Sequence, residues 1–246
     1  MIVNDPQNDA KTQINALIQI ANGYMPDTDK ANQALQKIIE RDDADIETKA
    51  RIKLQMTDNI LKQKEPDRAK AAEIFFDIAY DKNLLNYGLR LNAFDKGVQQ
   101  LLQMYEPAEK VIAKFEKMYA VPLKGADKVR FIAGYGNYLI QNSQFEKAIK
   151  IYLDYAKSEN TESAARQTDE WLGKLEAAMG NSEKSIQYFL SASNYIEVGN
   201  VLFEQKKYDE ANTRILEGME KQPENRSRLF GHMISKNPVD KLRELV

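Results

Sequence analysis

Apolar residues recur at intervals of three and four along most of this chain, which is the spacing of one face of an α-helix. The pattern is clearest over residues 134–160, where two apolar faces flank the polar turn Asn142-Ser143-Gln144. The two faces are formed by Tyr135, Tyr138 and Leu139, and by Phe145, Ala148, Ile149, Tyr152 and Tyr155. This stretch predicts two amphipathic helices folded back on each other.

The same spacing predicts helices along the rest of the chain, separated by Pro, Gly and charged breaks. The expected apolar faces lie at residues 14–21, 31–38, 46–61, 71–79, 91–101, 105–115, 171–173, 186–189, 198–202 and 211–215. No stretch alternates apolar and polar residues for long enough to predict a strand. We therefore predict an all-α fold.

Two positions suggest boundaries. The loop at 121–125 is the clearest interruption, and it predicts two groups of hairpins, 1–122 and 123–246, or a single continuous solenoid that runs through both. Asn237-Pro238 predicts the start of a last short helix, because Asn caps helix N-termini and Pro fits the first turn. That helix would carry Val239, Leu242 and Leu245.

The helices form a repeat. The small residues near the start of each second helix are Ala34, Ala71, Ala108, Ala148, Ser185 and Ala211, at successive steps of 37, 37, 40, 37 and 26 residues. A unit of that length holds two helices of three to four turns and two short connections. Frequent Pro and Gly breaks exclude one long coiled coil. We expect about six helical hairpins, each burying its apolar face against its neighbours.

The last three units share a pattern of large, glycine and small residues at fixed spacing. The last unit has Tyr195, Val198-Gly199, Leu202, Ala211, Ile215 and Pro223 in these places. The central unit has Ile132, Tyr135-Gly136, Leu139, Ala148 and Tyr152, and the unit between them has Leu172-Gly173, Gly180, Ser185, Phe189 and Ala192. In all three, twelve residues separate the glycine from the aligned Ala or Ser. This pattern resembles that of tetratricopeptide repeats over residues 130–223, with a more divergent match over 27–120.

The resemblance implies a right-handed α-α superhelix whose concave face is lined by first helices. One recurrent contact position directly follows the repeat glycine, and the residues expected there are Asn137, Lys174 and Asn200. Lys96 is expected at the same position of the preceding unit if its inter-helix turn contains one or two extra residues. Ile140 and Phe203 are expected to form apolar pockets beside this column. The basic clamp of some family members is not expected, because its positions hold Asn92, Ala133, Glu170 and Ile196.

Charge and composition narrow the expected partners. Lys+Arg total 35 against 37 Asp+Glu, and no basic stripe is visible, so binding to nucleic acid or anionic membranes is not expected. Cysteine is absent, and no apolar run reaches the ~18–20 residues of a transmembrane helix. The first residues lack the features of a signal peptide. We expect a cytoplasmic protein if the chain is complete, or an exported one if a signal has been removed.

No catalytic arrangement, cofactor site or metal site is expected. His232 is the only histidine, and Gly134-Tyr135-Gly136 lacks the third glycine of a dinucleotide motif. The acidic run 42–45 lacks the glycine and terminal glutamate of a calcium loop.

The expected function is therefore a non-enzymatic scaffold that holds a protein or peptide segment. Two alternatives stay open. One is a structural subunit that self-associates through its terminal repeats, where Val239, Leu242, Leu245 and Val246 either cap the final repeat or contact a partner. The other is a helical regulatory domain of a larger protein.

Overall fold

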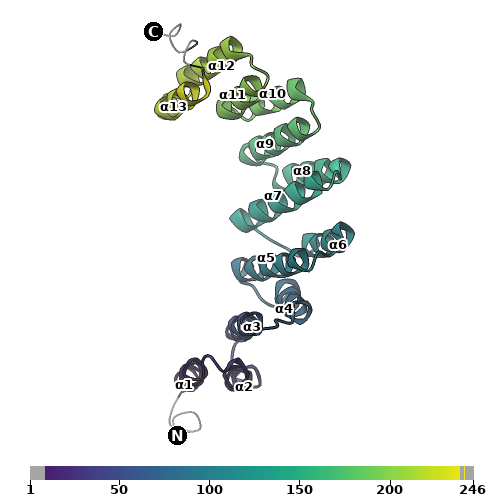
Figure 1. Cartoon of the computed structure of the whole chain (residues 1–246), viewed down its shortest axis with the longest axis vertical. Helices are drawn as coiled ribbons and strands as arrows, with labels where there is room; N and C mark the ends of the chain where they lie inside the picture. The colour runs from purple at the N-terminus through teal and green to yellow at the C-terminus, as the bar shows by residue number, and fades with distance from the viewer. Residues whose placement is uncertain (1–8, 239–240, 242–246) are drawn as a thin grey trace. The chain divides into compact units, whose positions relative to one another are not determined.

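The computed structural model describes residues 9–238 and 241, and that part of the chain contains helices and no strand (Figure 1). The helices are α1 (Ala10–Gly23), α2 (Thr28–Ile39), α3 (Ile46–Leu61), α4 (Arg68–Tyr80), α5 (Tyr87–Gln103), α6 (Ala108–Tyr119), α7 (Gly125–Gln141), α8 (Phe145–Glu159), α9 (Glu162–Ala178), α10 (Ser182–Ser191), α11 (Tyr195–Glu204), α12 (Tyr208–Lys221) and α13 (Arg226–Lys236). A short 3-10 turn, η2 (Pro223–Asn225), precedes α13. Helices pack against their neighbours in sequence order, which confirms the predicted all-α hairpin architecture.

Short polar side chains begin most of the early helices. The side chain of each capping residue accepts a hydrogen bond from the backbone N–H three residues later. This bond satisfies one of the free donors of the first turn. The caps of α1 to α5 are Asp9, Asp27, Asp45, Asp67 and Asn86. Asp45 also accepts the Thr48 hydroxyl at 2.6 Å. The acidic run at 42–45 therefore serves, in part, to start α3.

Most predicted helices are present, and one residue is placed differently. The bounds of α3 match the predicted 46–61, and α7 ends at Gln141 before the predicted turn. Tyr105 was expected on the apolar face of a second helix, and that prediction is wrong. It lies in the connection before α6, with φ 55° and 93% of its side chain exposed. The predicted C-terminal helix with Val239, Leu242 and Leu245 lies outside the described residues.

The structure also corrects the register of the repeat. The fourth residue of each second helix is almost completely buried, at 1% exposure or less, and these residues are Ala31, Ala71, Val111, Ala148, Ser185 and Ala211. Ala31 and Val111, rather than Ala34 and Ala108, are therefore the equivalent positions in α2 and α6. The steps become 40, 40, 37, 37 and 26 residues.

The short last step has a structural cause. Helices α10 and α11 contain 10 residues each, whereas α8 and α9 contain 15 and 17. A step of 26 residues predicts an unusually short connection after Phe189, and that prediction is wrong. The connection between α10 and α11 is of ordinary length, and the two helices themselves are short.

Contacts between Cα atoms divide the chain into two compact units, residues 1–131 and 132–246, with the division inside α7. In the N-terminal unit, α4 and α5 pack closely, and an ideal Cβ on Gly97 would lie 2.9 Å from the Phe76 ring. Aromatic rings fill the space beyond them. Phe94 lies edge-on to Phe115 and Phe131, with ring centroids 4.9 Å and 5.6 Å away.

In the C-terminal unit, each repeat glycine receives a large side chain from the second helix of its own hairpin. Ideal Cβ atoms on Gly136, Gly173 and Gly199 would lie 2.0 Å, 2.7 Å and 2.8 Å from Tyr152, Phe189 and Ile215, respectively. In every case the large residue follows the glycine by sixteen positions. Only a residue without Cβ leaves room for this contact, so these glycines allow the two helices of each hairpin to pack closely.

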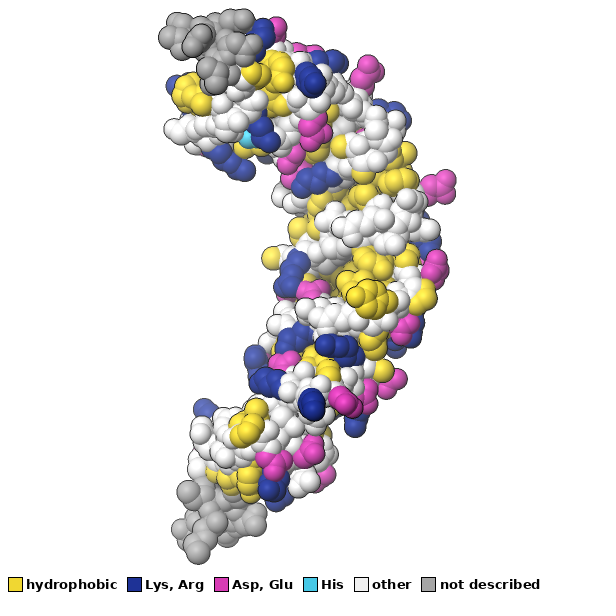
Figure 2. Space-filling view, viewed as in Figure 1, with side chains coloured by type: hydrophobic (Ala, Val, Ile, Leu, Met, Phe, Trp, Pro, Cys, Tyr) yellow, Lys and Arg dark blue, Asp and Glu magenta, His cyan; other side chains and the backbone are white. Residues whose placement is uncertain are grey.

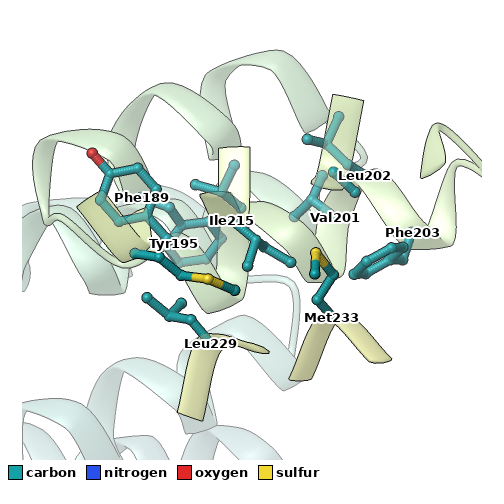
Figure 3. Packing of buried hydrophobic residues seen from close by; sticks show 11 residues of the cluster. Phe189, Tyr195, Val201, Leu202, Phe203, Ile215, Leu229 and Met233 are labelled. Atoms are coloured by element: carbon teal, nitrogen blue, oxygen red, sulfur yellow. The ribbon is translucent and has the colours of Figure 1, made fainter. Parts of the chain in front are cut away.

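The core at the end of the C-terminal unit is shown in Figure 3. Phe189, Tyr195 and Ile215 from α10, α11 and α12 meet there, and Leu229 and Met233 reach the same cluster from α13. All five are at most 5% exposed. Helix α13 is therefore an integral part of this core.

Candidate functional site

A cleft of about 430 Å³ opens in the N-terminal unit between α1, α3 and α5, which are the first helices of three successive hairpins. We call it the N-terminal cleft. Its walls are formed by Ala21, Asn22, Met25, Arg51, Leu54, Gln55, Asp58, Asn59, Lys62, Leu89, Asn92 and Lys96. The repeat thus places one helix face from each hairpin around a common opening.

A bidentate ion pair fixes one wall of the N-terminal cleft. The Lys96 ammonium donates to both carboxylate oxygens of Asp58, at 2.7 Å and 2.8 Å. The same ammonium lies 5.5 Å from the centre of the Phe75 ring, within the range of a cation–π contact. Lys96 is therefore held against α3 and α4, with 34% of its side chain exposed.

Two further cations give the N-terminal cleft its positive character. Arg51 pairs with Glu47 one turn earlier at 2.6 Å, and Asn86 also donates to Glu47 at 3.0 Å. These hydrogen bonds lower the pKa of Glu47 below its usual value, with the Arg51 bond contributing most. Lys62 has no ion pair or hydrogen bond from its side chain to any described residue. It is the cation of the cleft that a ligand carboxylate meets without breaking an existing pair.

Four amide side chains supply the remaining polar groups of the cleft: Asn22, Gln55, Asn59 and Asn92. The Gln55 amide donates to Asn22 at 3.2 Å, and that of Asn59 donates to Asn32 at 2.9 Å. Each amide offers both a donor and an acceptor, as the peptide backbone does. Leu54 and Leu89 provide apolar surface between them. This combination suits an extended polypeptide segment.

A second cleft, of about 480 Å³, lies in the C-terminal unit; we call it the C-terminal cleft. Its walls are formed by Arg166, Glu170, Ala192, Ser193, Asn194, Tyr195, Ile196, Gln222, Glu224, Asn225, Arg228 and Leu229. The Gln222 amide donates to the Ser193 carbonyl at 2.7 Å. Two arginines and two glutamates balance one another, so this cleft has no net charge to select a ligand.

A third opening, of about 630 Å³, lies between α2, α3 and α4 on another side of the N-terminal unit. Its walls are formed by Asp29, Asn32, Gln36, Ile39, Lys53, Met56, Ile60, Gln63, Asp67, Lys70, Ile74 and Asp77. We call it the α2–α4 groove. It is more apolar than the N-terminal cleft.

The column predicted from the sequence is only partly brought to these clefts. Lys96 lines the N-terminal cleft, whereas Asn137, Lys174 and Asn200 line none of the three. Lys174 pairs with Glu170 at 3.3 Å on its own helix, and the Asn200 amide donates to Glu197 at 3.1 Å. Asn137 is exposed on α7. Lys96 instead faces α3, where it pairs with Asp58.

The two apolar residues of that prediction also differ in their surroundings. Ile140 is half-buried near the end of α7. Phe203 is 8% exposed and lies in the C-terminal core, with its ring 6.3 Å from Tyr208 and 6.2 Å from His232. Phe203 thus belongs to the core rather than to the wall of an open pocket.

Sequence reasoning missed the helix positions that line the clefts. Asn92 lies in the N-terminal cleft, and Glu170 and Ile196 lie in the C-terminal cleft. Because these residues are not basic, the sequence predicts no clamp there and assigns them no other role. Their spacing of one helical turn from the predicted column was the signal, because residues four apart share a helix face.

His232 is a half-buried residue of α13 whose Nε2 has no hydrogen-bond partner among the described residues. Burial lowers its pKa, and the nearby Lys236 and Arg228 lower it further, while Glu197 opposes them. Among residues 9–238 and 241, no group of three or more acidic or histidine side chains is arranged to hold a metal ion. Within the same residues, no helix has both the length and the apolar character to cross a bilayer.

Basic and acidic side chains alternate over the face shown in Figure 2, without a large patch of either sign. No protein-family model matches this sequence, and no curated protein matches it.

Proposed function

We propose that the hairpins are tetratricopeptide-like repeats and that the chain is a non-enzymatic scaffold, which binds an extended peptide segment in the N-terminal cleft. The constant spacing of glycine, small residue and large residue in the C-terminal unit supports the repeat assignment. The single observation that carries the binding proposal is the cleft between α1, α3 and α5, in which amides and cations surround apolar surface.

The chemistry of the N-terminal cleft favours a ligand with a carboxylate. Arg51, Lys62 and Lys96 line it against one acidic residue, Asp58. Since Arg51 and Lys96 already have carboxylate partners, Lys62 is the group that gains most from an acidic ligand. A hydrogen bond to a charged group contributes about 1.5–3 kcal/mol of net free energy. The proposed ligand is an extended segment with an Asp, a Glu or a terminal carboxylate.

A displayed library of random peptides, selected on the immobilised chain, tests the proposal. We expect enrichment of acidic sequences that also contain apolar residues. Calorimetric titration of an enriched peptide should show at least about tenfold weaker binding to Lys62→Glu, equivalent to about 1.4 kcal/mol. Binding should also weaken as salt rises, because exposed charges are screened over about 8–10 Å at moderate ionic strength.

Lys53→Glu is the matched control, since Lys53 lies in the α2–α4 groove and the change in net charge is identical. It should leave the affinity nearly unchanged. Selection of peptides without acidic residues, or equal binding to Lys62→Glu and wild type, would contradict binding of an acidic peptide in the N-terminal cleft.

A further inference from the structure

Helix α13 presents a row of exposed residues that includes two large apolar side chains. The row consists of Ser227, Phe230, Gly231 and Ile234, with Phe230 50% and Ile234 42% exposed. An ideal Cβ on Gly231 would meet no atom within 4 Å. Figure 2 shows apolar side chains at the surface over α12 and α13. The row is a narrow apolar surface with a gap at its centre.

The equivalent row is buried on earlier first helices. In α7 the residue before the glycine and the residue three after it are Tyr135 and Leu139, at 3% and 0% exposure. In α11 they are Val198 and Leu202, both at 0%. Gly136 and Gly199 are closed by Tyr152 and Ile215 of the following helix, whereas Gly231 has no such neighbour among the described residues. Within that part of the chain, helix α13 therefore carries the packing face of a first helix with no second helix on it.

The opposite face of α13 is firmly anchored. Leu229 and Met233 are each 2% exposed and join the core beside Tyr195 and Phe203 (Figure 3). Helix α9 uses Trp171, two residues before its glycine, in the same way, stacked on Tyr152 with ring centroids 5.1 Å apart. The exposed row is thus held in a fixed orientation by the core.

The chain's own residues after α13 do not match the pattern of a second helix. The position twelve residues after Gly231 is Arg243, where the other hairpins of the C-terminal unit have Ala148, Ser185 and Ala211. The side chains of Asn237 and Asn212 exchange two hydrogen bonds, at 3.1 Å and 2.7 Å. Lys241 pairs with Asp209 at 3.2 Å. The described residues beyond α13 thus contact α12.

Charge indicates the kind of helix that fits. Helix α13 carries Arg226, Arg228 and Lys236 and no acidic residue. None of these three cations forms an ion pair with a described residue. A helix that docks on this row gains most if it is acidic, because complementary charge steers association and fixes the register.

We propose that the exposed row of α13 binds an amphipathic, acidic α-helix of a partner protein, which presents a small residue and, four residues later, a large side chain over Gly231. Burial of Phe230 and Ile234 supplies apolar contact, and the gap at Gly231 selects the large side chain. This surface is separate from the N-terminal cleft, and neither proposal depends on the other.

Fluorescence anisotropy with a labelled peptide tests this directly. The probe is the α10 sequence, residues 181–192, with Lys184→Glu and Gln187→Glu; Ser185 and Phe189 provide the small and the large residue. We expect the full chain to bind this peptide saturably, with a Kd below about 1 mM. Gly231→Leu should weaken it at least about tenfold by filling the gap. The same probe with Phe189→Ala should also bind at least about tenfold more weakly.

Gly134→Leu is the matched protein control, because Gly134 is another exposed helical glycine with no atom within 4 Å of an ideal Cβ. It should leave binding unchanged. Equal binding of both probes, or equal binding by Gly231→Leu and wild type, overturns the proposal. The proposal is also overturned if wild type self-associates in sedimentation velocity and Gly231→Leu does not. In that case the row binds a second copy of the chain. If deletion of residues 239–246 raises the affinity for the peptide by about tenfold or more, the exposed row binds the chain's own C-terminal segment, and the proposal is overturned.

Discussion

The two units of this protein close their helices on each other by different means. In the C-terminal unit, a glycine on the first helix of each hairpin admits a large side chain sixteen residues later, so the two backbones come close. In the N-terminal unit, the buried Gly97 instead faces Phe76, twenty-one residues earlier, on the helix that precedes its own. The tightest helix contact therefore falls within hairpins in one unit and between hairpins in the other.

The difference teaches where each unit tolerates a change of volume. Around α5, α6 and α7, the rings of Phe94, Phe115 and Phe131 span the space between helices, so loss of a ring leaves a cavity. Around Gly136 and Ala148, the backbones leave no spare space, so an added carbon atom causes a clash. We expect substitutions that shorten a side chain to be most harmful in the first unit. Substitutions that enlarge a side chain should be most harmful in the second.

The largest effect is expected from Phe115→Ala. Phe115 is 7% exposed, and its ring contacts those of Phe94 and Phe131. Truncation of a buried Phe to Ala costs about 3–5 kcal/mol of unfolding free energy through lost burial and the remaining cavity. Urea denaturation followed by circular dichroism measures the loss. Phe115→Leu should cost clearly less, and equal losses for both variants would contradict the cavity argument.

Next in size is Ala148→Leu, which adds three carbon atoms at a side chain with 0% exposure. Ser185, the equivalent residue of the next hairpin, donates its hydroxyl to the Gly173 carbonyl at 2.8 Å, so this position lies against the first helix. Overpacking there should cost about 2–3 kcal/mol, and the far-UV helical signal should survive because neighbouring hairpins stay folded. Ala177→Leu, at an exposed position, is the control. An unchanged melting temperature for Ala148→Leu would show that the repeat register is wrong.

A smaller effect, with a change of sign, is expected for two glycines of α7. A Cβ on Gly136 would lie 2.0 Å from the Tyr152 hydroxyl, so Gly136→Ala should lower stability by about 1–2 kcal/mol. Gly134 has open space around its Cβ position, and Gly134→Ala should raise stability by about 0.5–1 kcal/mol through helix propensity. Chemical denaturation of both variants gives the comparison. If both shift the midpoint in the same direction, close packing at Gly136 is disproved.

The smallest effect is expected for Tyr152→Phe, which removes a buried hydroxyl without a hydrogen-bond partner among the described residues. Stability at neutral pH should rise by up to about 1 kcal/mol, since an unsatisfied buried polar group is removed. Burial raises the pKa of Tyr152 above its ordinary value near 10, so the folded state holds this proton more tightly than the unfolded chain does. Its contribution to stability is complete below about pH 10 and is lost as the pH rises further.

Tyr152→Phe should accordingly lose less stability than wild type between about pH 10 and 11. Tyr80, whose pKa burial also raises, is present in both proteins and leaves a residual loss. Identical alkaline slopes for the two proteins would mean that Tyr152 is not buried in solution.

The sequence was sufficient to predict the fold class, because the apolar spacing over segments such as 46–61 and 134–160 is strong and the breaks between them are clear. It was insufficient for the register of the first hairpins. Ala31 and Ala34 both lie on the buried face of α2, and only the packed structure distinguishes 1% from 6% exposure. In α6 the expected small residue, Ala108, is the half-buried first residue of the helix, and the buried equivalent position holds the larger Val111.

The candidate site was predicted less well for a related reason. Apolar spacing shows which residues share one face of a helix, so Lys96 could be predicted as a site residue. It does not show which residues of other helices contact that face, here Asp58 of α3 and Phe75 of α4. Contacts between residues about twenty to forty positions apart depend on how hairpins stack. The exposed row of α13 was missed because Phe230-Gly231 was not recognised as another large-residue–glycine pair of the repeat.

The central claim, that the N-terminal cleft is the peptide-binding site, is tested most directly by methyl-labelled NMR during titration with a selected acidic peptide. We predict that the methyl signals of Met25, Leu54 and Leu89, which line the cleft, shift together and saturate. Signals from the α2–α4 groove, such as those of Ile39 and Ile74, should stay in place, as should that of Ile234 on α13. Shifts confined to Ile39 and Ile74, or to Ile234, with no change at Leu54 and Leu89, would contradict the claim.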